Sequence, residues 1–143
     1  MAVGVEKRNG TSGGDDRSVL DMHLTRTARA PGEARRSLEA LRHRVDPAVF
    51  DDVRLLVSEL VTNSVQHEGP DPRSWVEVRL RVSAAAVRGE VINPGPGFHP
   101  EPRPPGQGQE SGRGLYLVDQ LANRWGVSKN GVTRVWFEIA ASS

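Results

Sequence analysis

Residues 59–67 have the sequence Glu-Leu-Val-Thr-Asn-Ser-Val-Gln-His, and they lie within a segment, 47–67, whose apolar residues recur at helical spacing. That spacing predicts a long helix buried on most sides. Glu59, Asn63 and His67 interrupt the apolar pattern at intervals of four, so they share one helix face. An amide oxygen is a suitable ligand for Mg²⁺, and a carboxylate can accept a proton or orient a hydroxyl. The alternative is a polar stripe where the helix meets water.

The segments around this helix predict the rest of the fold. Pro31 opens a second segment with helical spacing that extends to Val45, and a further helix is expected over 115–122. Strands are predicted, mostly from alternating apolar and polar residues, at 19–25, 75–82, 86–92, 125–128 and 132–139. Asn130-Gly131 between the last two indicates a hairpin. This order predicts a two-layer α/β sandwich, with helices on one face of a mixed, mostly antiparallel sheet.

Composition excludes several classes of protein. With no cysteine, the chain has no disulfide, thiolate zinc site or cysteine nucleophile. Lys+Arg 19 against Asp+Glu 18 gives a net charge of +1, which argues against nonspecific binding to nucleic acid or membranes. No apolar run approaches the ~20 residues of a membrane-spanning helix. We expect a soluble cytoplasmic protein with a disordered tail at 1–17, rich in glycine and polar residues, and one domain at 18–143.

Two glycine-containing segments are candidate ligand-binding loops. Residues 93–98, Asn-Pro-Gly-Pro-Gly-Phe, follow a predicted strand, where Gly95 and Gly97 let the backbone approach a flat ligand and Asn93 can present its amide to a purine edge. Residues 111–115, Ser-Gly-Arg-Gly-Leu, open a predicted helix, whose free N–H groups favour an anion. The long Pro- and Gly-rich loop between them is typical of a lid. The alternatives are a turn without a ligand and a flexible hinge.

Taken together and in this order, the segments at 59–67, 93–98 and 112–118 resemble the N, G1 and G2 boxes of the GHKL ATP-binding superfamily. Within it, they are similar to the stand-alone anti-sigma-factor serine/threonine kinases, as are 125–127 and 135–138. The resemblance covers about residues 19–139. It implies a protein kinase that binds Mg²⁺ and ATP, phosphorylates a STAS-domain anti-anti-sigma partner, binds a sigma factor and forms a homodimer.

The resemblance also implies roles for individual residues. Asn63 would coordinate the Mg²⁺ that bridges the phosphates, Glu59 would be the base or orienting group for the attacking hydroxyl, and His67 would lie near the phosphates. The remaining nucleotide contacts would come from the two glycine boxes and the last strand, namely Asn93, Gly95, Gly97, Gly112, Arg113, Gly114, Leu115 and Thr133.

Asn93 departs from the family pattern, because the first position of the G1 box is usually an aspartate that accepts a proton from the adenine amino group. A neutral amide is a weaker acceptor by about 1–2 kcal/mol, or roughly tenfold in affinity. The alternative function is therefore a nucleotide-weak or inactive module that sequesters a sigma factor or another regulator. A basic run around the first helix suits an acidic partner, and comprises Arg26, Arg29, Arg35, Arg36, Arg42 and Arg44. The ATPase half of a split histidine kinase is disfavoured, because no phosphoacceptor helix accompanies the domain.

Overall fold

The computed structural model describes residues 18–94 and 111–141. The predicted tail, Gly95, Gly97 and most of the predicted lid lie outside the described residues. Along the chain the elements are β1 (Ser18–Arg26), α1 (Ala30–Leu38), a 3₁₀ helix η1 (Glu39–Arg44), α2 (Pro47–Glu68), β2 (Asp71–Val82), β3 (Ala86–Pro94), α3 (Ser111–Leu121), β4 (Arg124–Lys129) and β5 (Val132–Ala140).

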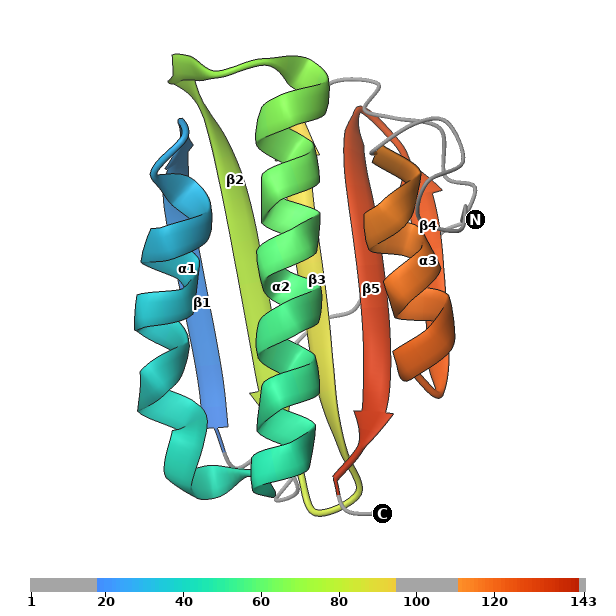
Figure 1. The fold of residues 1–143 in the computed structure, drawn as a ribbon. Helices are drawn as coiled ribbons and strands as arrows, with labels where there is room; N and C mark the ends of the chain where they lie inside the picture. Colours follow the sequence, from blue (N-terminus) through green and yellow to red (C-terminus); the bar gives the residue numbers. More distant parts are fainter. Residues whose placement is uncertain (1–17, 95–110, 142–143) are drawn as a thin grey trace.

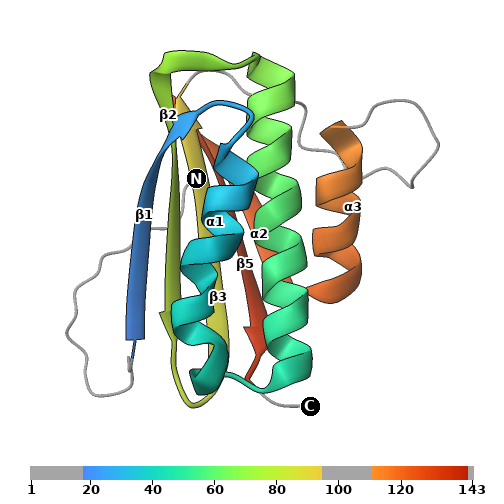
Figure 2. The same cartoon turned by 60° about the vertical axis from the view of Figure 1, so that its left-hand side comes forward.

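The five described strands form one sheet in the order β1-β2-β3-β5-β4, and α1, α2 and α3 cover one face of it (Figures 1 and 2). The two-layer α/β sandwich is confirmed. The parallel component expected of a mixed sheet is not found, because all four pairs of neighbouring strands are antiparallel. The strand order explains this difference. It places β5 between β3 and β4, so the two strands joined through α3 are not neighbours.

The first predicted helix is shorter than its apolar pattern indicated. α1 ends at Leu38, and the chain continues as η1 up to Arg44, before Val45 becomes extended. In a 3₁₀ helix, side chains three residues apart lie over each other. Accordingly, Arg42 donates to both carboxylate oxygens of Glu39, at 2.7 and 2.9 Å, and this hydrogen bonding lowers the pKa of Glu39. Leu38 and Leu41, also three apart, are both buried.

The long helix begins and ends as expected. Asp46 caps α2 by accepting from the backbone N–H of Ala48 at 2.9 Å, with Pro47 in the first turn. Two other boundaries differ from the prediction. β2 begins at Asp71 rather than Trp75, and α3 begins at Ser111, so the glycines predicted to precede that helix lie in its first turn.

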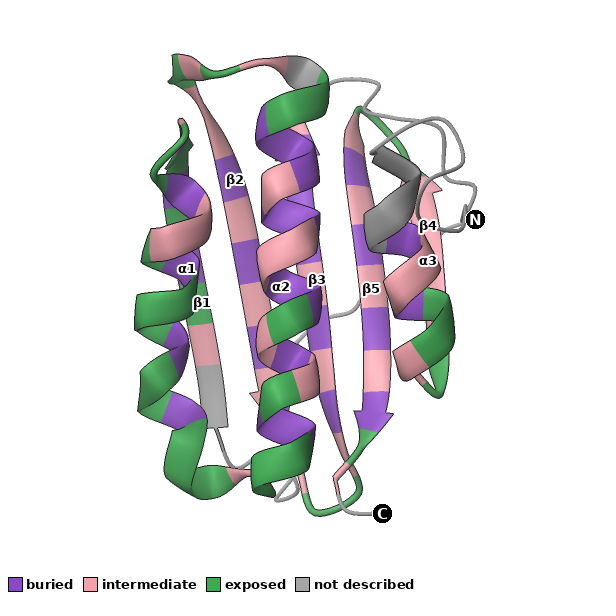
Figure 3. Ribbon diagram, in the orientation of Figure 1, coloured by how far each residue is buried: buried purple, intermediate pink, exposed green. Residues whose placement is uncertain are grey.

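The core lies between the helices and the inner face of the sheet (Figure 3). The apolar stripe of α2 is buried throughout, and Phe137 on β5 lies in the middle of the core. Gly89 is directly opposite Phe137 across β3 and β5. A Cβ atom on Gly89 would lie 2.4 Å from the Phe137 ring, so only glycine leaves room for that ring.

The outer face of the sheet carries no helix among the described residues, and its side chains are largely charged. Arg88 donates to Glu138 at 3.0 Å across β3 and β5, and its guanidinium lies 4.4 Å from the centre of the Trp136 ring. On the neighbouring strand Gly126 lies opposite Trp136. A Cβ atom on Gly126 would lie 2.6 Å from the indole nitrogen, so the indole covers this glycine.

Candidate functional site

Buried polar side chains mark one end of the inner face of the sheet. Among the described residues, the buried polar or charged ones are Arg26, Asn63, Ser64, Asn93 and Thr133. Four of them lie on α2, β3 and β5, where the last turns of α2, the end of β3 and the start of β5 meet (Figure 1). Burial of a polar group is unfavourable unless it is hydrogen-bonded. This polar cluster, which comprises Asn63, Ser64, Asn93 and Thr133, is therefore the candidate functional site.

Asn93 lies at the centre of the polar cluster and is 2% exposed. It lies directly across from Thr133 in the β3–β5 pairing. Its amide oxygen accepts a hydrogen bond from the Ser64 hydroxyl at 3.2 Å, and its amide nitrogen donates to the carbonyl of Pro94 at 3.2 Å. Asn93 therefore connects α2 to the end of β3, at the point where the chain enters the predicted lid.

Ser64 was not among the site residues predicted from the sequence. Its hydroxyl also lies 3.2 Å from the carbonyl of Leu60, one turn earlier in α2. The signal was present in the sequence, because Ser64 occupies a core position in the stripe that contains Val57, Leu60 and Val61. A polar residue at a core position of a helix indicates a buried partner on the element that the helix covers.

The predicted stripe on α2 lies on a single unbroken helix, as expected. Along it, Glu59 is half-buried, Asn63 is 3% exposed and His67 is exposed. Asn63 and Ser64 are consecutive and therefore point about 100° apart around the helix axis. Ser64 contacts β3, so the stripe at 59, 63 and 67 lies on a neighbouring face of α2.

The first turn of α3 lies at the same end of the sheet as the polar cluster (Figure 1). Gly112, Arg113 and Gly114 belong to this turn, although their side chains lie outside the described part of the chain. Leu115 and Val118 are fully buried and anchor α3 on the core, so Leu115 serves in packing. The start of a helix presents free backbone N–H groups, which favour an anion such as phosphate.

The profile of the histidine kinase-like ATPase domain matches residues 24–139, which include every described element at least in part. The chain belongs to this family. The match and the antiparallel five-stranded sheet confirm the GHKL fold that the three sequence boxes predicted. Within the described residues, none of the ATPase domain's helices combines the length and the apolar character needed to span a membrane.

Two examples show what this ATPase domain is similar to. A protein of Streptomyces coelicolor, named only as uncharacterized protein SCO4941, is 37% identical over 79 residues, which are 54% of this chain and 74% of that protein. The crystal structure of the RsbU and RsbW domains of Rv1364c from Mycobacterium tuberculosis matches with a TM-score of 0.64 and 20% identity. That match covers 86% of this chain and 32% of the other. This chain therefore spans about a third of the length of the solved Rv1364c chain.

Histidine kinase-like ATPase domains act on ATP with Mg²⁺, and the donor set of the polar cluster fits that pair. Asn63 supplies a buried amide oxygen, the hard neutral ligand that Mg²⁺ accepts. Among the described residues no group of three or more His, Asp or Glu side chains gathers into a metal cage. A single protein ligand suits Mg²⁺, which is usually held by one or two protein oxygens together with substrate phosphates and water.

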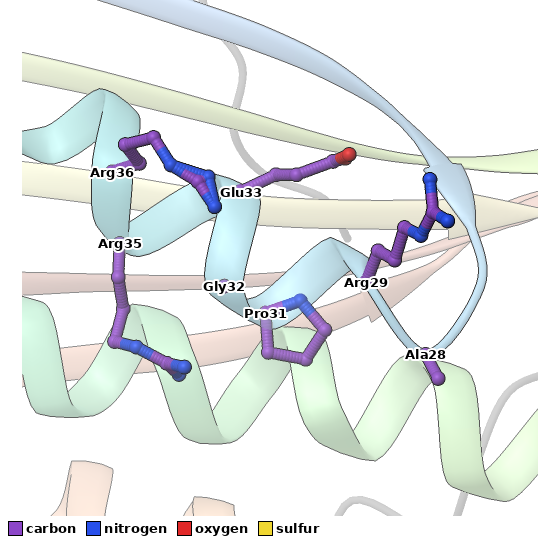
Figure 4. A pocket seen from close by; sticks show the side chains of 7 residues that line it. All are labelled: Ala28, Arg29, Pro31, Gly32, Glu33, Arg35 and Arg36. Atoms are coloured by element: carbon purple, nitrogen blue, oxygen red, sulfur yellow. The ribbon is translucent and has the colours of Figure 1, made fainter.

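A second feature of the ATPase domain is a pocket of about 550 Å³ at the start of α1 (Figure 4). It shares no residue with the polar cluster and is lined by Ala28, Arg29, Pro31, Gly32, Glu33, Arg35 and Arg36. Arg35 extends toward α2, where it donates to the Ser58 hydroxyl at 2.7 Å. With three arginines and one glutamate, the pocket is basic.

Not every arginine of the predicted basic run contributes to that surface. Arg26 is 7% exposed, and it donates to the carbonyl of Gly69 and to the Ser74 hydroxyl, each at 3.0 Å. It therefore fixes the turn between α2 and β2 and does not face a partner. Arg42 is paired with Glu39 and also lies over the Phe50 ring, at 4.5 Å from its centre. The basic surface is thus narrower than the sequence indicated.

Proposed function

We propose that this chain is an anti-sigma-factor-like serine/threonine protein kinase, which transfers the γ-phosphoryl group of ATP to a STAS-domain anti-anti-sigma partner. The observation that carries the proposal is the pair formed by Asn63 and Glu59. A buried amide lies one turn from a half-buried carboxylate on the same face of α2, at the end of the sheet where α3 begins. The same proposal includes a cytoplasmic location, a sigma factor as second partner and a homodimer, with no role for nucleic acid.

In this mechanism Asn63 would hold Mg²⁺, which would supply neutralisation of phosphate charge. The start of α3, with Gly112, Arg113 and Gly114, binds the phosphates through backbone N–H groups. Glu59 accepts the proton of the partner's serine or threonine hydroxyl. The hydroxyl oxygen then bonds to the γ-phosphorus while the bond to the departing ADP oxygen breaks. Catalysis depends mainly on positioning and on charge stabilisation, so the chain needs no further nucleophile.

The test is transfer of labelled γ-phosphate to purified STAS-domain proteins. Glu59→Gln removes the proton acceptor with little change of shape, and we expect transfer to fall at least about a hundredfold while Mg²⁺·ATP still binds. Glu77→Gln is the matched control, because it makes the same chemical change on the outer face of β2. If Glu59→Gln transfers phosphate as well as the wild type does, Glu59 is not the base and the proposed mechanism is wrong.

A second candidate function is a binding module that sequesters a sigma factor or another regulator without using ATP. Two observations favour it, the neutral amide of Asn93 and the basic pocket beside α1. Calorimetric titration with Mg²⁺·ATP separates the two candidates. Micromolar affinity supports the kinase, whereas millimolar or no affinity supports the binding module. Charge reversal at Arg29 and Arg36 would then abolish binding to an acidic partner by the module.

A further inference from the structure

The carboxamide of Asn93 has only one orientation that satisfies both of its neighbours. The carbonyl of Pro94 can only accept a hydrogen bond, so the Asn93 atom 3.2 Å from it must be the amide nitrogen. The Ser64 hydroxyl can donate, and it lies 3.2 Å from the amide oxygen. The reverse orientation would place the amide oxygen against the Pro94 carbonyl oxygen with no proton between them. The structure therefore fixes which end of the amide each neighbour contacts.

These two contacts use only half of the hydrogen-bonding capacity of Asn93. A carboxamide has two N–H donors and an oxygen with two lone pairs. Among the described residues, one N–H is directed to Pro94 and one lone pair to Ser64, whose single proton also has the Leu60 carbonyl at 3.2 Å. With respect to these neighbours, the group retains the capacity to donate one further bond and accept one further bond. A carboxylate at the same position can only accept.

The other members of the polar cluster share this two-way chemistry. Asn63 is a second amide, and Ser64 and Thr133 carry hydroxyls, which donate as well as accept. The cluster contains no carboxylate among its buried members. The cluster therefore does not require the ligand to donate a hydrogen bond, as an aspartate would.

We infer that the nucleotide site of this chain tolerates either an amino or an oxo group at position 6 of the purine, so that inosine triphosphate binds as well as ATP. This inference rests on the proposed nucleotide binding. Adenine donates from its 6-amino group, whereas hypoxanthine and guanine present an accepting oxygen there. Asn93 can satisfy either group, because its remaining capacity includes one donor and one acceptor. A carboxylate would leave the oxo purine facing a second unprotonated acceptor, which a buried site rejects strongly.

The experiment is a calorimetric comparison of Mg²⁺·ATP with Mg²⁺·ITP, which carries an oxo group in place of the 6-amino group. We expect the two dissociation constants of the wild-type chain to agree within about fivefold, since both purines find a partner. Asn93→Asp should raise the ratio of the ITP constant to the ATP constant by at least about tenfold, because it removes the only donor of this side chain. Asn130→Asp is the control, because it makes the same change at an exposed turn position and should leave both constants unchanged.

The outcomes separate this inference from the proposed function. Binding of ATP with more than about tenfold discrimination against ITP by the wild type overturns the inference and leaves the nucleotide site intact. An unchanged ratio in Asn93→Asp overturns it as well. Failure of both nucleotides to bind overturns the proposed kinase, and the inference with it. Asn93→Asp places a carboxylate against the Pro94 carbonyl, so its folding is checked by circular dichroism. If this variant does not fold, the ratio of the ITP to the ATP dissociation constant of the wild type alone tests the inference.

Discussion

The hydroxyl of Ser64 on α2 lies 3.2 Å from the amide oxygen of Asn93 at the end of β3. This contact joins the helix layer to the sheet at the candidate site. Ser64→Ala leaves a buried amide oxygen without this donor, which destabilises a protein by about 1–3 kcal/mol. Urea unfolding monitored by circular dichroism measures the loss. Ser58→Ala removes the acceptor of a solvent-exposed hydrogen bond from Arg35, and it should change the free energy of unfolding much less. Equal losses of unfolding free energy in the two variants would show that the Ser64–Asn93 contact stabilises the protein no more than the Arg35–Ser58 hydrogen bond does.

Asn63→Ala tests the predicted metal ligand. The substitution removes the buried amide oxygen from α2, so we expect ATP binding to weaken about tenfold in the presence of Mg²⁺ and to change little in EDTA. The measurement is a titration of ATP under the two conditions. Asn130→Ala, at the exposed β4–β5 turn, serves as the control. The same loss of affinity with and without Mg²⁺ would indicate that Asn63 supports the fold and does not bind the metal.

Arg26→Met tests the turn between α2 and β2. The substitution leaves the carbonyl of Gly69 without its donor at 3.0 Å, and because this acceptor is only partly buried we expect a destabilisation of about 1 kcal/mol. The free energy of unfolding in urea is the readout. The control is Arg73→Met, whose side chain is 92% exposed and whose loss should have no measurable effect. If Arg26→Met is as stable as the wild type, the burial of Arg26 contributes nothing to stability.

A comparison of two glycines tests how firmly each face of the sheet is packed. Gly89→Ala places a methyl group 2.4 Å from the Phe137 ring, which lies in the core and cannot move freely, so we expect a cost of about 1–3 kcal/mol. Gly126→Ala meets the Trp136 indole at 2.6 Å, but that indole is half-buried on the outer face and can shift. We therefore expect a smaller loss of stability and a change in tryptophan fluorescence. A larger loss for Gly126→Ala would contradict this interpretation.

Periodicity predicted most of the elements, because burial of one face determines which residues of a helix or strand are apolar. The alternation from Val76 to Val82 and the stripe from Val49 to Val65 both lie on buried faces, as predicted. Periodicity did not indicate how Thr133 and Asn93 lie; the resemblance named both as nucleotide contacts, and the strand register places them opposite each other. Helices and strands whose apolar residues follow the buried face are therefore predictable from one sequence.

Features that depend on partners distant in the sequence were not predictable in this way. The burial of Arg26 depends on Gly69 and Ser74, more than forty residues away, and a lone arginine before a basic helix gives no sign of them. The 3₁₀ geometry after Leu38 was not predictable for a different reason, because Leu38 and Leu41 are apolar at a spacing that suits either kind of helix. The Asn130-Gly131 turn predicted the β4–β5 hairpin, but no local pattern indicated that β5 rather than β4 pairs with β3.

The strand order has a consequence for the synthesis of the protein. β5 is the last strand along the chain, yet it lies inside the sheet, between β3 and β4. A nascent chain on the ribosome therefore carries an open edge on β3, and Asn93 lacks its cross-strand neighbour, until residues 132–140 have emerged. Contacts between segments so distant form slowly, because a long loop must first be closed. Premature termination before residue 132 would leave an incomplete β-sheet whose exposed edge is prone to aggregation, rather than a smaller working domain.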